Sequence, residues 1–160
     1  MDKSLLRQQV LERLAEDLLR VEQAAQTAHE AATHEENIAE NKYDTLGLEA
    51  AYLATGQARR ADAIRQAIVS WRSFSPALYK PSQGIQLGAL IVLVDADDKQ
   101  QRLFIGPKGG NMTLSCDGEL TQVISSQAPL ARALLGKCEG DDVSLEVASV
   151  RREFEVLKVY

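Results

Sequence analysis

Aromatic residues, cysteines and long apolar runs are scarce in this sequence, and each shortage argues against a particular class of protein. No apolar run approaches the roughly 18 residues of a membrane-spanning helix, and the amino-terminal residues alternate charge with leucine, unlike a signal peptide. The two cysteines, Cys116 and Cys138, lack the paired spacing of metal ligands, which fits a reducing compartment. We therefore expect a cytoplasmic protein with both thiols free.

A basic excess and the common catalytic motifs are missing as well. Acidic residues outnumber basic ones by 23 to 18, which argues against nonspecific binding of duplex nucleic acid. In the glycine-rich segment 106–111 the lysine precedes the glycine pair, and no Ser or Thr follows the lysine in the register of a phosphate-binding loop. The segment therefore fits a hairpin loop better. No nucleophile elbow surrounds any serine, and neither cysteine has a histidine nearby in sequence. An autonomous enzyme is therefore not expected.

Apolar residues recur at alternating steps of three and four on both sides of the segment from His34 to Asp44. This spacing predicts one helix from about Ser4 to about Ala32 and a second from about Asp44 to about Arg72. The repeating residues are Leu11, Leu14, Leu18, Val21, Ala25, Ala28 and Ala32, then Ala50, Ala54, Ala61, Ile64, Ile68 and Trp71. We expect residues 1–74 to form an antiparallel coiled-coil hairpin. Because such a hairpin pairs its own apolar stripes, a monomer is favoured, and a dimer through the exposed hairpin is the alternative.

The composition changes between Ser73 and Gly84, where two prolines and three serines end the helical period. We expect residues 75–84 to be a linker and residues 85–160 to form a second domain. There the apolar period falls to two, and a segment closed by Gly136 predicts one short helix at 129–135. The predicted strands are Leu87–Val94, Gln101–Ile105, Met112–Cys116, Leu120–Ser125, Val143–Val147 and Glu153–Val159. The expected fold class is α+β, a helical hairpin followed by a small antiparallel β domain.

The tip of the predicted hairpin carries four carboxylates, Glu35, Glu36, Glu40 and Asp44. A tip between two long helices lies far from any core, so these groups contribute little to folding. They either present negative charge to another molecule or belong to a solvated loop that caps the helices. Carboxylate oxygens suit Mg²⁺, but one or two of them do not make a full coordination set. The tip would therefore complete a metal site that a partner supplies, and we expect no cofactor of the chain's own.

Three arginines, Arg59, Arg60 and Arg65, lie on the returning helix about 20 residues beyond the tip. As surface residues they can simply solvate the hairpin. The alternative is contact with a nucleic-acid backbone or with the acidic wall of a channel.

Three segments of the second half closely resemble the end of the Gre-type transcript cleavage factors of bacterial RNA polymerase. They are Pro129–Lys137, Gly140–Val143 and Arg152–Tyr160, and Glu40-Asn41 followed by Tyr43 is similar to the Ser-Glu-Asn-x-x-Tyr tip motif of that family. The resemblance implies an FKBP-like C-terminal domain that docks at the rim of the polymerase secondary channel, while the coiled coil enters it. It also implies that tip carboxylates help the polymerase bind its second Mg²⁺ for cleavage of backtracked RNA, near the RNA 3′ end. The chain itself would not be an enzyme.

Prolyl isomerases share the FKBP-like fold, but their pocket is lined by aromatic residues. Aromatic residues make up only 5% of this chain, and its single tryptophan, Trp71, lies in the hairpin stripe. Isomerase activity is therefore not expected, since the analogy is one of fold alone.

The sequence departs from the family pattern at the tip and at the docking segment. Family tips have Asp three residues before the glutamate, where this chain has Asn37, whose neutral amide brings no charge to a metal. Glu36 is the alternative second carboxylate. The family's Asp-Ser-Pro before the short helix is replaced by Gln127-Ala128-Pro129, and the proline-glycine turn before the last strand is replaced by residues 148–150.

Three functions stay open on these residues. The first is a Gre-like factor that modulates elongation or stimulates transcript cleavage through Glu40 with Asn37 or Glu36. The second is a regulator that occupies the channel without cleavage. The third is a coiled-coil adaptor unrelated to polymerase.

Overall fold

The computed structural model describes residues 2–34, 40 and 45–160. By packing, the chain divides into two compact units, one made of Met1–Leu11 with Val69–Tyr160 and the other of Glu12–Ile68. The expected limits of the hairpin (1–74), the linker (75–84) and the second domain (85–160) stay predictions. Within the described residues, no helix combines the length and apolarity that crossing a membrane demands.

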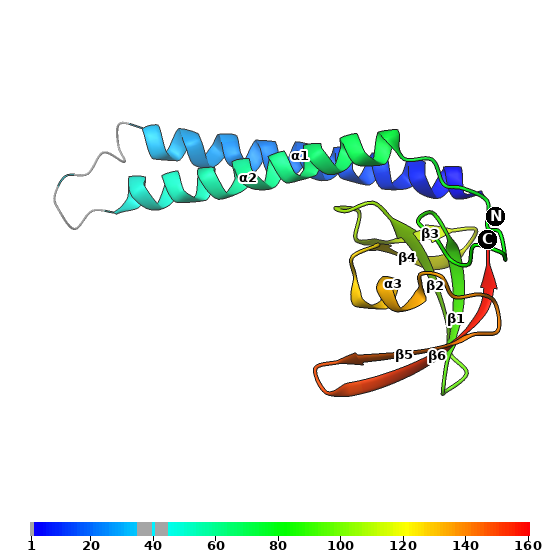
Figure 1. Cartoon of the computed structure of the whole chain (residues 1–160). Helices are drawn as coiled ribbons and strands as arrows, with labels where there is room; N and C mark the ends of the chain where they lie inside the picture. Colours follow the sequence, from blue (N-terminus) through cyan, green and yellow to red (C-terminus); the bar gives the residue numbers. More distant parts are fainter. Residues whose placement is uncertain (1, 35–39, 41–44) are drawn as a thin grey trace. The chain divides into compact units, whose positions relative to one another are not determined.

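Two long helices form the hairpin, α1 at Lys3–Thr33 and α2 at Leu46–Ser73, and they run side by side (Figure 1). The prediction of an antiparallel helical hairpin is confirmed, with helix ends within two residues of those expected. Each helix begins at a side chain that binds the first turn. The Ser4 N–H donates to the Asp2 carboxylate at 2.8 Å, and the Thr45 hydroxyl donates to Glu49 Oε1 at 3.1 Å. In Glu12–Ile68 the buried apolar residues are Leu14, Val21, Ala28, Ala61, Ala67 and Ile68.

The other unit contains a sheet of six strands in the order β3-β4-β2-β1-β6-β5. The strands are β1 Leu90–Asp95, β2 Gln100–Gly106, β3 Met112–Cys116, β4 Glu119–Ser125, β5 Asp142–Val147 and β6 Val150–Val159. The predicted strands and the short helix, α3 at Pro129–Leu134, are confirmed. The sheet is mixed rather than wholly antiparallel, because β2 and β4 pair in parallel. The loop after β2 is long enough to place β3 one position outward, and β4 then returns between them.

Both faces of this sheet are covered. On one face, α3 and the segment before β1 close a core of Ile85, Ala89, Ile91, Leu93, Leu103, Ile105, Ile124, Ala131, Leu134, Val143, Phe154, Val156 and Val159. On the other face lies Phe104, which alternates with Leu103 and Ile105 along β2. Its ring packs 6.2 Å from that of Trp71, a fully buried residue near the end of α2. Leu6 and Val10 of α1 are also fully buried in this unit.

Hydrogen bonds fix the ends of the two helices within the same unit. The Arg7 guanidinium donates to the main-chain carbonyls of Trp71 at 2.9 Å and of Arg72 at 2.5 Å. The Lys3 ammonium donates to the carbonyls of Ala77 and Tyr160, which brings the start of α1 next to the end of β6 (Figure 1). The two bonds from Arg7 satisfy carbonyl groups that the end of α2 leaves without helical partners.

Candidate functional site

Of the four predicted tip carboxylates, Glu40 is the one that the structure describes, and it is exposed at a bend. Glu36 and Asn37, together with Glu35 and Asp44, lie outside the described residues. Among the residues described, no three His, Cys, Asp or Glu side chains come together as a metal site. The predicted role of the tip in a shared Mg²⁺ site therefore stays a prediction, and Glu40 is the residue on which it can be tested.

The three arginines of α2 differ in what they contact. Arg65 is held by two carboxylates, Glu22 of α1 at 2.6 Å and Asp62 at 2.5 Å, and the hydrogen bond to Glu22 raises the pKa of its guanidinium. This ion pair joins the two helices of the hairpin. Arg59 and Arg60 are exposed, and no described residue forms an ion pair with either one. Arg59 and Arg60 are therefore available to a partner, whereas Arg65 is engaged inside the hairpin.

An open groove of about 530 Å³ follows the middle of the hairpin between α1 and α2. Its lining consists of Glu22, Ala25, Gln26, His29, Ala54, Thr55, Ala58, Ala61, Asp62 and Arg65. Four alanines leave this hollow because their side chains do not fill the space between the helices. The lining carries both signs of charge, so it favours neither an anion nor a cation.

The predicted docking residues Gln127, Ala128 and Pro129 form a turn that leads into α3. The main chain of Ser125 accepts from the Ala128 N–H at 2.9 Å, and its hydroxyl accepts from the Gln127 N–H at 3.2 Å. Pro129 occupies the first turn of α3, where a missing N–H costs nothing. Gln127 and Pro129 are exposed, whereas Ala128 packs against the core. The segment is therefore both fixed and accessible.

The side chains that hold this turn have no signal in the sequence. Asn111, which follows the glycine-rich loop, accepts from the Ser125 N–H through its Oδ1 at 3.0 Å. Asn111 immediately precedes β3, whereas Ser125 ends β4, 14 residues later in the sequence. No local pattern could have paired them, because the bond depends on how β3 and β4 are placed in the sheet.

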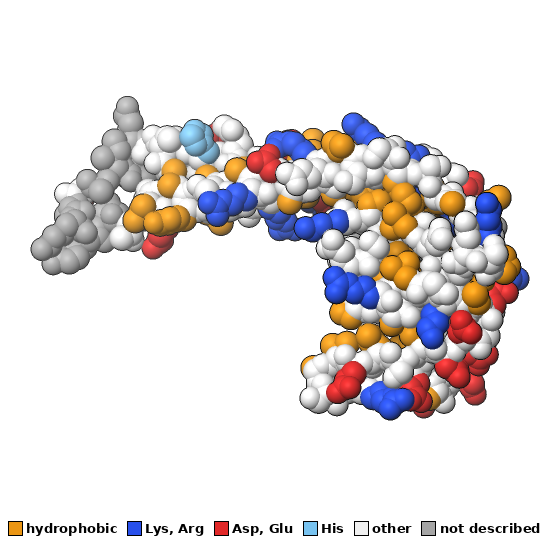
Figure 2. Space-filling model, viewed as in Figure 1, with side chains coloured by type: hydrophobic (Ala, Val, Ile, Leu, Met, Phe, Trp, Pro, Cys, Tyr) orange, Lys and Arg blue, Asp and Glu red, His pale blue; other side chains and the backbone are white. Residues whose placement is uncertain are grey.

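The hairpin of β5 and β6 lies beside α3 and carries an apolar end. Val147 and Val150 face each other across the two strands and are 49% and 60% exposed. Two pairs further along, Leu145 faces Arg152, whose guanidinium lies 5.2 Å from the centre of the Phe154 ring. Figure 2 shows hydrophobic side chains along the side of this hairpin that faces α3. Together with the turn at Gln127–Pro129, this surface is suited to an apolar partner.

The β5–β6 hairpin closes through Ala148 and Ser149, which replace the proline-glycine turn of the related family. Both residues adopt left-handed backbone angles, with φ of 51° and 65°. This is the two-residue turn that matches the twist of paired strands, and it normally selects Asn-Gly. The hairpin therefore has the favoured geometry with residues that are poorly suited to it.

Comparison with known proteins agrees with the resemblance drawn from the sequence. The family model "Transcription elongation factor, GreA/GreB, C-term" matches residues 80–160, just over half of the chain. Transcription elongation factor GreA of Xanthomonas campestris is 32% identical over 77 residues, which cover 47% of this chain and 44% of that protein. GreA of a Sulfurovum species is 36% identical over 76 residues, covering 47% and 43%. The chain thus spans less than half the length of the curated relatives that it matches.

Solved structures with similarity along the whole chain come from a divergent Gre homologue. The GreA factor homolog 1 protein of Thermus thermophilus is 26% identical, with a TM-score of 0.39 and 94% of each chain covered. A second structure of the transcription factor Gfh1 is 28% identical, with a TM-score of 0.42 and coverage of 94% and 92%. On the match of the family model over residues 80–160, this chain belongs to the GreA/GreB family of transcription elongation factors.

Proposed function

We propose that this protein binds bacterial RNA polymerase through its C-terminal domain and extends its helical hairpin through the secondary channel towards the active site. The observation that carries the proposal is the family match over residues 80–160, which contains the docking turn and the β5–β6 hairpin. The hairpin adds reach, since the 28 residues of α2 extend about 42 Å at 1.5 Å per residue. The site of action is then the cytoplasm, where the polymerase works.

Docking through this domain rests on apolar and main-chain contacts more than on charge. Gln127 and Ala128 replace the family's Asp and Ser before the short helix, and the proline is kept as Pro129. Gln127 and Pro129 are exposed. Val147 and Val150 add apolar surface on the neighbouring hairpin, and Arg152 adds a cation at its edge. We expect binding that depends only weakly on salt, because exposed ion pairs are the contacts that salt screens.

The tip has one described carboxylate, Glu40, and its likeness to the family's tip motif supports a role for it at the polymerase active site. A single carboxylate can only complete a site built by other ligands, so Glu40, with Glu36 as the alternative second oxygen donor, would share a Mg²⁺ with the polymerase. Such an ion would stabilise the negative charge that develops in the transition state of phosphodiester cleavage. The catalytic centre belongs to the polymerase, and this chain at most stimulates it. The exposure of Arg59 and Arg60 supports contact of these side chains with the RNA near its 3′ end or with the channel wall.

A second function competes with cleavage, namely occupation of the channel without stimulating it. The observation that favours it is Asn37, a neutral residue where family tips have Asp. Loss of one charge weakens the attraction for a divalent cation while leaving the docking domain and the hairpin unchanged. An adaptor unrelated to polymerase has no support from the C-terminal domain, which is the part that matches the family model.

The test is RNA cleavage in a backtracked elongation complex with the cognate polymerase. The wild type, Glu40→Ala and Asn37→Asp are compared, with Glu30→Ala, an exposed glutamate of α1, as the matched control. Stimulation by the wild type that is lost in Glu40→Ala establishes a cleavage factor. A silent wild type that competes with an active Gre factor, with activity gained in Asn37→Asp, establishes a channel occupant. If the intact protein does not co-purify with core polymerase, the proposal is wrong.

Docking needs its own variant, because a tip variant does not alter it. Ser125→Ala removes the hydroxyl that accepts from the Gln127 N–H while leaving the main-chain bond to Ala128. We expect weaker co-purification with polymerase and an unchanged fold by circular dichroism. Ser115→Ala, at an exposed serine of β3 on the opposite edge of the sheet from the β5–β6 hairpin, is the matched control.

A further inference from the structure

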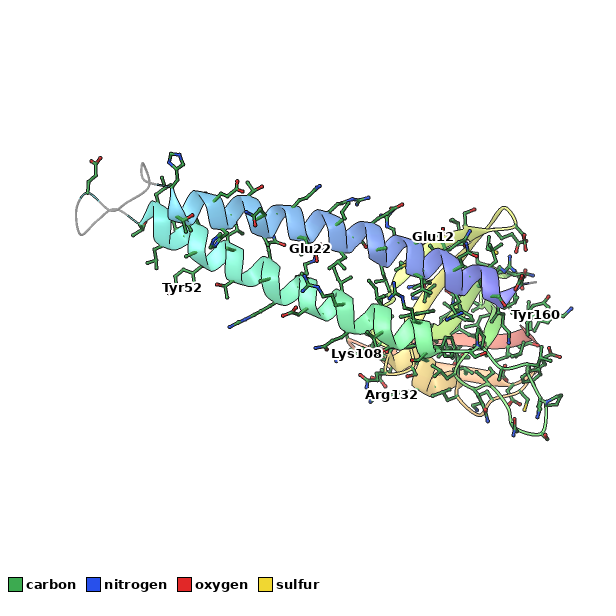
Figure 3. All side chains as sticks on the ribbon, turned by 90° about the horizontal axis from the view of Figure 1, so that it is seen from above. Glu12, Glu22, Tyr52, Lys108, Arg132 and Tyr160 are labelled. Atoms are coloured by element: carbon green, nitrogen blue, oxygen red, sulfur yellow. The ribbon has the colours of Figure 1, made fainter. Side chains whose placement is uncertain are left out.

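Large apolar side chains are exposed on the distal part of α2. Leu46, Leu48, Tyr52 and Leu53 lie within eight residues and are 57%, 57%, 71% and 58% exposed. Figure 3 shows Tyr52 on the side of α2 that points away from α1. Soluble chains rarely leave such a group of apolar residues in water unless it meets a partner.

The outer side of α2 has a regular repeat of its own. Six exposed positions follow each other at alternating steps of four and three, which places them along one face of a helix. They are Thr45, Glu49, Tyr52, Gly56, Arg59 and Ala63. Ala50, Ala54 and Ala61 form the opposite, inner face in the same spacing. Leu48 and Leu53 flank the outer repeat, so α2 has a second seam of coiled-coil spacing that no described residue covers.

This outer seam is complementary to itself when it meets an antiparallel copy. A two-fold axis beside Ala54 places Glu49 opposite Arg59, Tyr52 opposite Gly56 and Thr45 opposite Ala63. The first pairing joins opposite charges, and neither arginine at 59 or 60 forms an ion pair with a described residue. The second sets a large ring against a glycine, around which a Cβ would meet nothing within 4 Å. Charge and size thus match at the same register.

We infer that two copies of this protein associate through the outer face of α2, in antiparallel orientation about Ala54. The occupant of the exposed apolar surface is then a second copy of the chain. The contact is short, since 18 residue steps from Thr45 to Ala63 extend about 27 Å. Contacts of that size are typical of weak complexes, so the dimer forms only at high protein concentration.

Such a dimer has a regulatory consequence, which rests on the proposed function. The face that pairs in the dimer belongs to the hairpin that is proposed to enter the polymerase channel. One hairpin cannot be covered by a second copy and inserted into a narrow channel at once. Dimerisation and polymerase binding therefore exclude each other. At concentrations above the dimer's Kd, most free protein is dimeric and cannot bind the polymerase.

The experiment is sedimentation equilibrium of the full chain from low to high micromolar concentration, and it requires no polymerase. The wild type is compared with Glu49→Arg and Arg59→Glu, each of which sets like charges opposite each other twice per dimer. Reversing exposed pairs of this kind is expected to weaken the dimer roughly tenfold. An equal mixture of the two variants restores both attractive pairs, so it should form a heterodimer at least as tight as the wild-type dimer.

A steric variant tests the register independently of charge. Gly56→Gln introduces a side chain where the Tyr52 ring of the second copy is expected, and it should abolish dimerisation. Because glutamine is a better helix former than glycine, the same change should raise the Tm of the monomer, which separates a lost contact from a damaged fold. Gln66→Ala, on α2 beyond the seam's six positions, is the control and should leave the dimer intact.

Three outcomes overturn the inference. The wild type stays monomeric at every concentration, or both charge variants dimerise as well as the wild type, or their mixture fails to recover association. If the variants instead alter only polymerase binding, the apolar surface contacts the polymerase and no dimer exists. The proposed function has a separate readout in co-purification, so either conclusion can fail alone.

Discussion

Gly110→Ala is predicted to destabilise the fold because the added methyl group would enter the space of the Trp71 ring. A Cβ built on Gly110 lies closer than 3.0 Å to three atoms of that ring, and Trp71 itself is 0% exposed. The φ angle of Gly110 is not in the left-handed region, so its backbone conformation suits alanine. The whole effect therefore comes from overpacking. Extra methyl groups in a packed core cost about 1 to 3 kcal/mol.

The assay is urea unfolding followed by the fluorescence of the single tryptophan, with circular dichroism for variants that lack it. A loss of about 1 to 3 kcal/mol corresponds to a fall in Tm of roughly 2 to 4 °C per kcal/mol in a chain of this size. In a Trp71→Leu background the ring is gone, so the same Gly110→Ala change should cost much less. This coupling between the two positions is the direct evidence of contact.

A matched control comes from the hairpin. A Cβ on Gly56 meets nothing within 4 Å, so Gly56→Ala should stabilise α2 by about 0.8 to 1 kcal/mol through helix propensity alone. The reasoning is refuted if Gly110→Ala is neutral in the wild type, or if it costs the same with and without the tryptophan.

The remaining predictions concern a turn, a titrating group and a helix end. Replacing Ala148 and Ser149 by Asn and Gly should raise the free energy of unfolding by about 1 to 2 kcal/mol, since left-handed angles cost that much per ordinary residue, and thermal melts that show no gain would contradict it. Hydrogen bonds from the backbone N–H groups of the turn after β1 lower the pKa of Asp95. The ionised carboxylate therefore stabilises the fold above the pKa of the unfolded chain, and this stabilisation is lost as the pH falls through the lower pKa of the folded protein. Asp95→Asn should therefore weaken the acid dependence of stability below about pH 4, measured by urea unfolding at several pH values. Arg7→Ala should cost about 1 to 2 kcal/mol by removing donors to two carbonyls at the end of α2, whereas Arg13→Ala, at an exposed ion pair, should change little.

Helices and strands were predictable because their signals are local. The steps of three and four gave both helices of the hairpin, and the period of two gave β3 with its observed limits, Met112–Cys116. The parallel pairing of β2 with β4 was not predicted, since strand order depends on a loop that lets β3 lie outside β4 rather than on any local pattern. Trp71 was assigned to the hairpin stripe on spacing alone. Its packing against Gly106 and Gly110 of the sheet is a contact between distant residues, which spacing does not encode.

In the candidate site, too, short local motifs were predictable and contacts between distant residues were not. Gln127–Pro129 and Glu40 were found by resemblance of short motifs, and the structure describes their exposure. Their supporting groups, Asn111 and Ser125, had no signal, because side-chain bonds to distant backbone leave no trace in sequence. The outer seam of α2 is visible in the sequence as a repeat, but only the exposure of Tyr52 distinguishes it from a solvated face.

The hydrogen bond from Lys3 to the carbonyl of Tyr160 has a consequence for how the chain is synthesised. The unit that contains the sheet combines Met1–Leu11 with Val69–Tyr160, so β6 must leave the ribosome before this unit can close. Until then Leu6, Val10 and Trp71 have no sheet to cover them. Fragments that begin after the hairpin would leave one face of the sheet bare, and expression of such a fragment should give an aggregating product rather than a small independent domain.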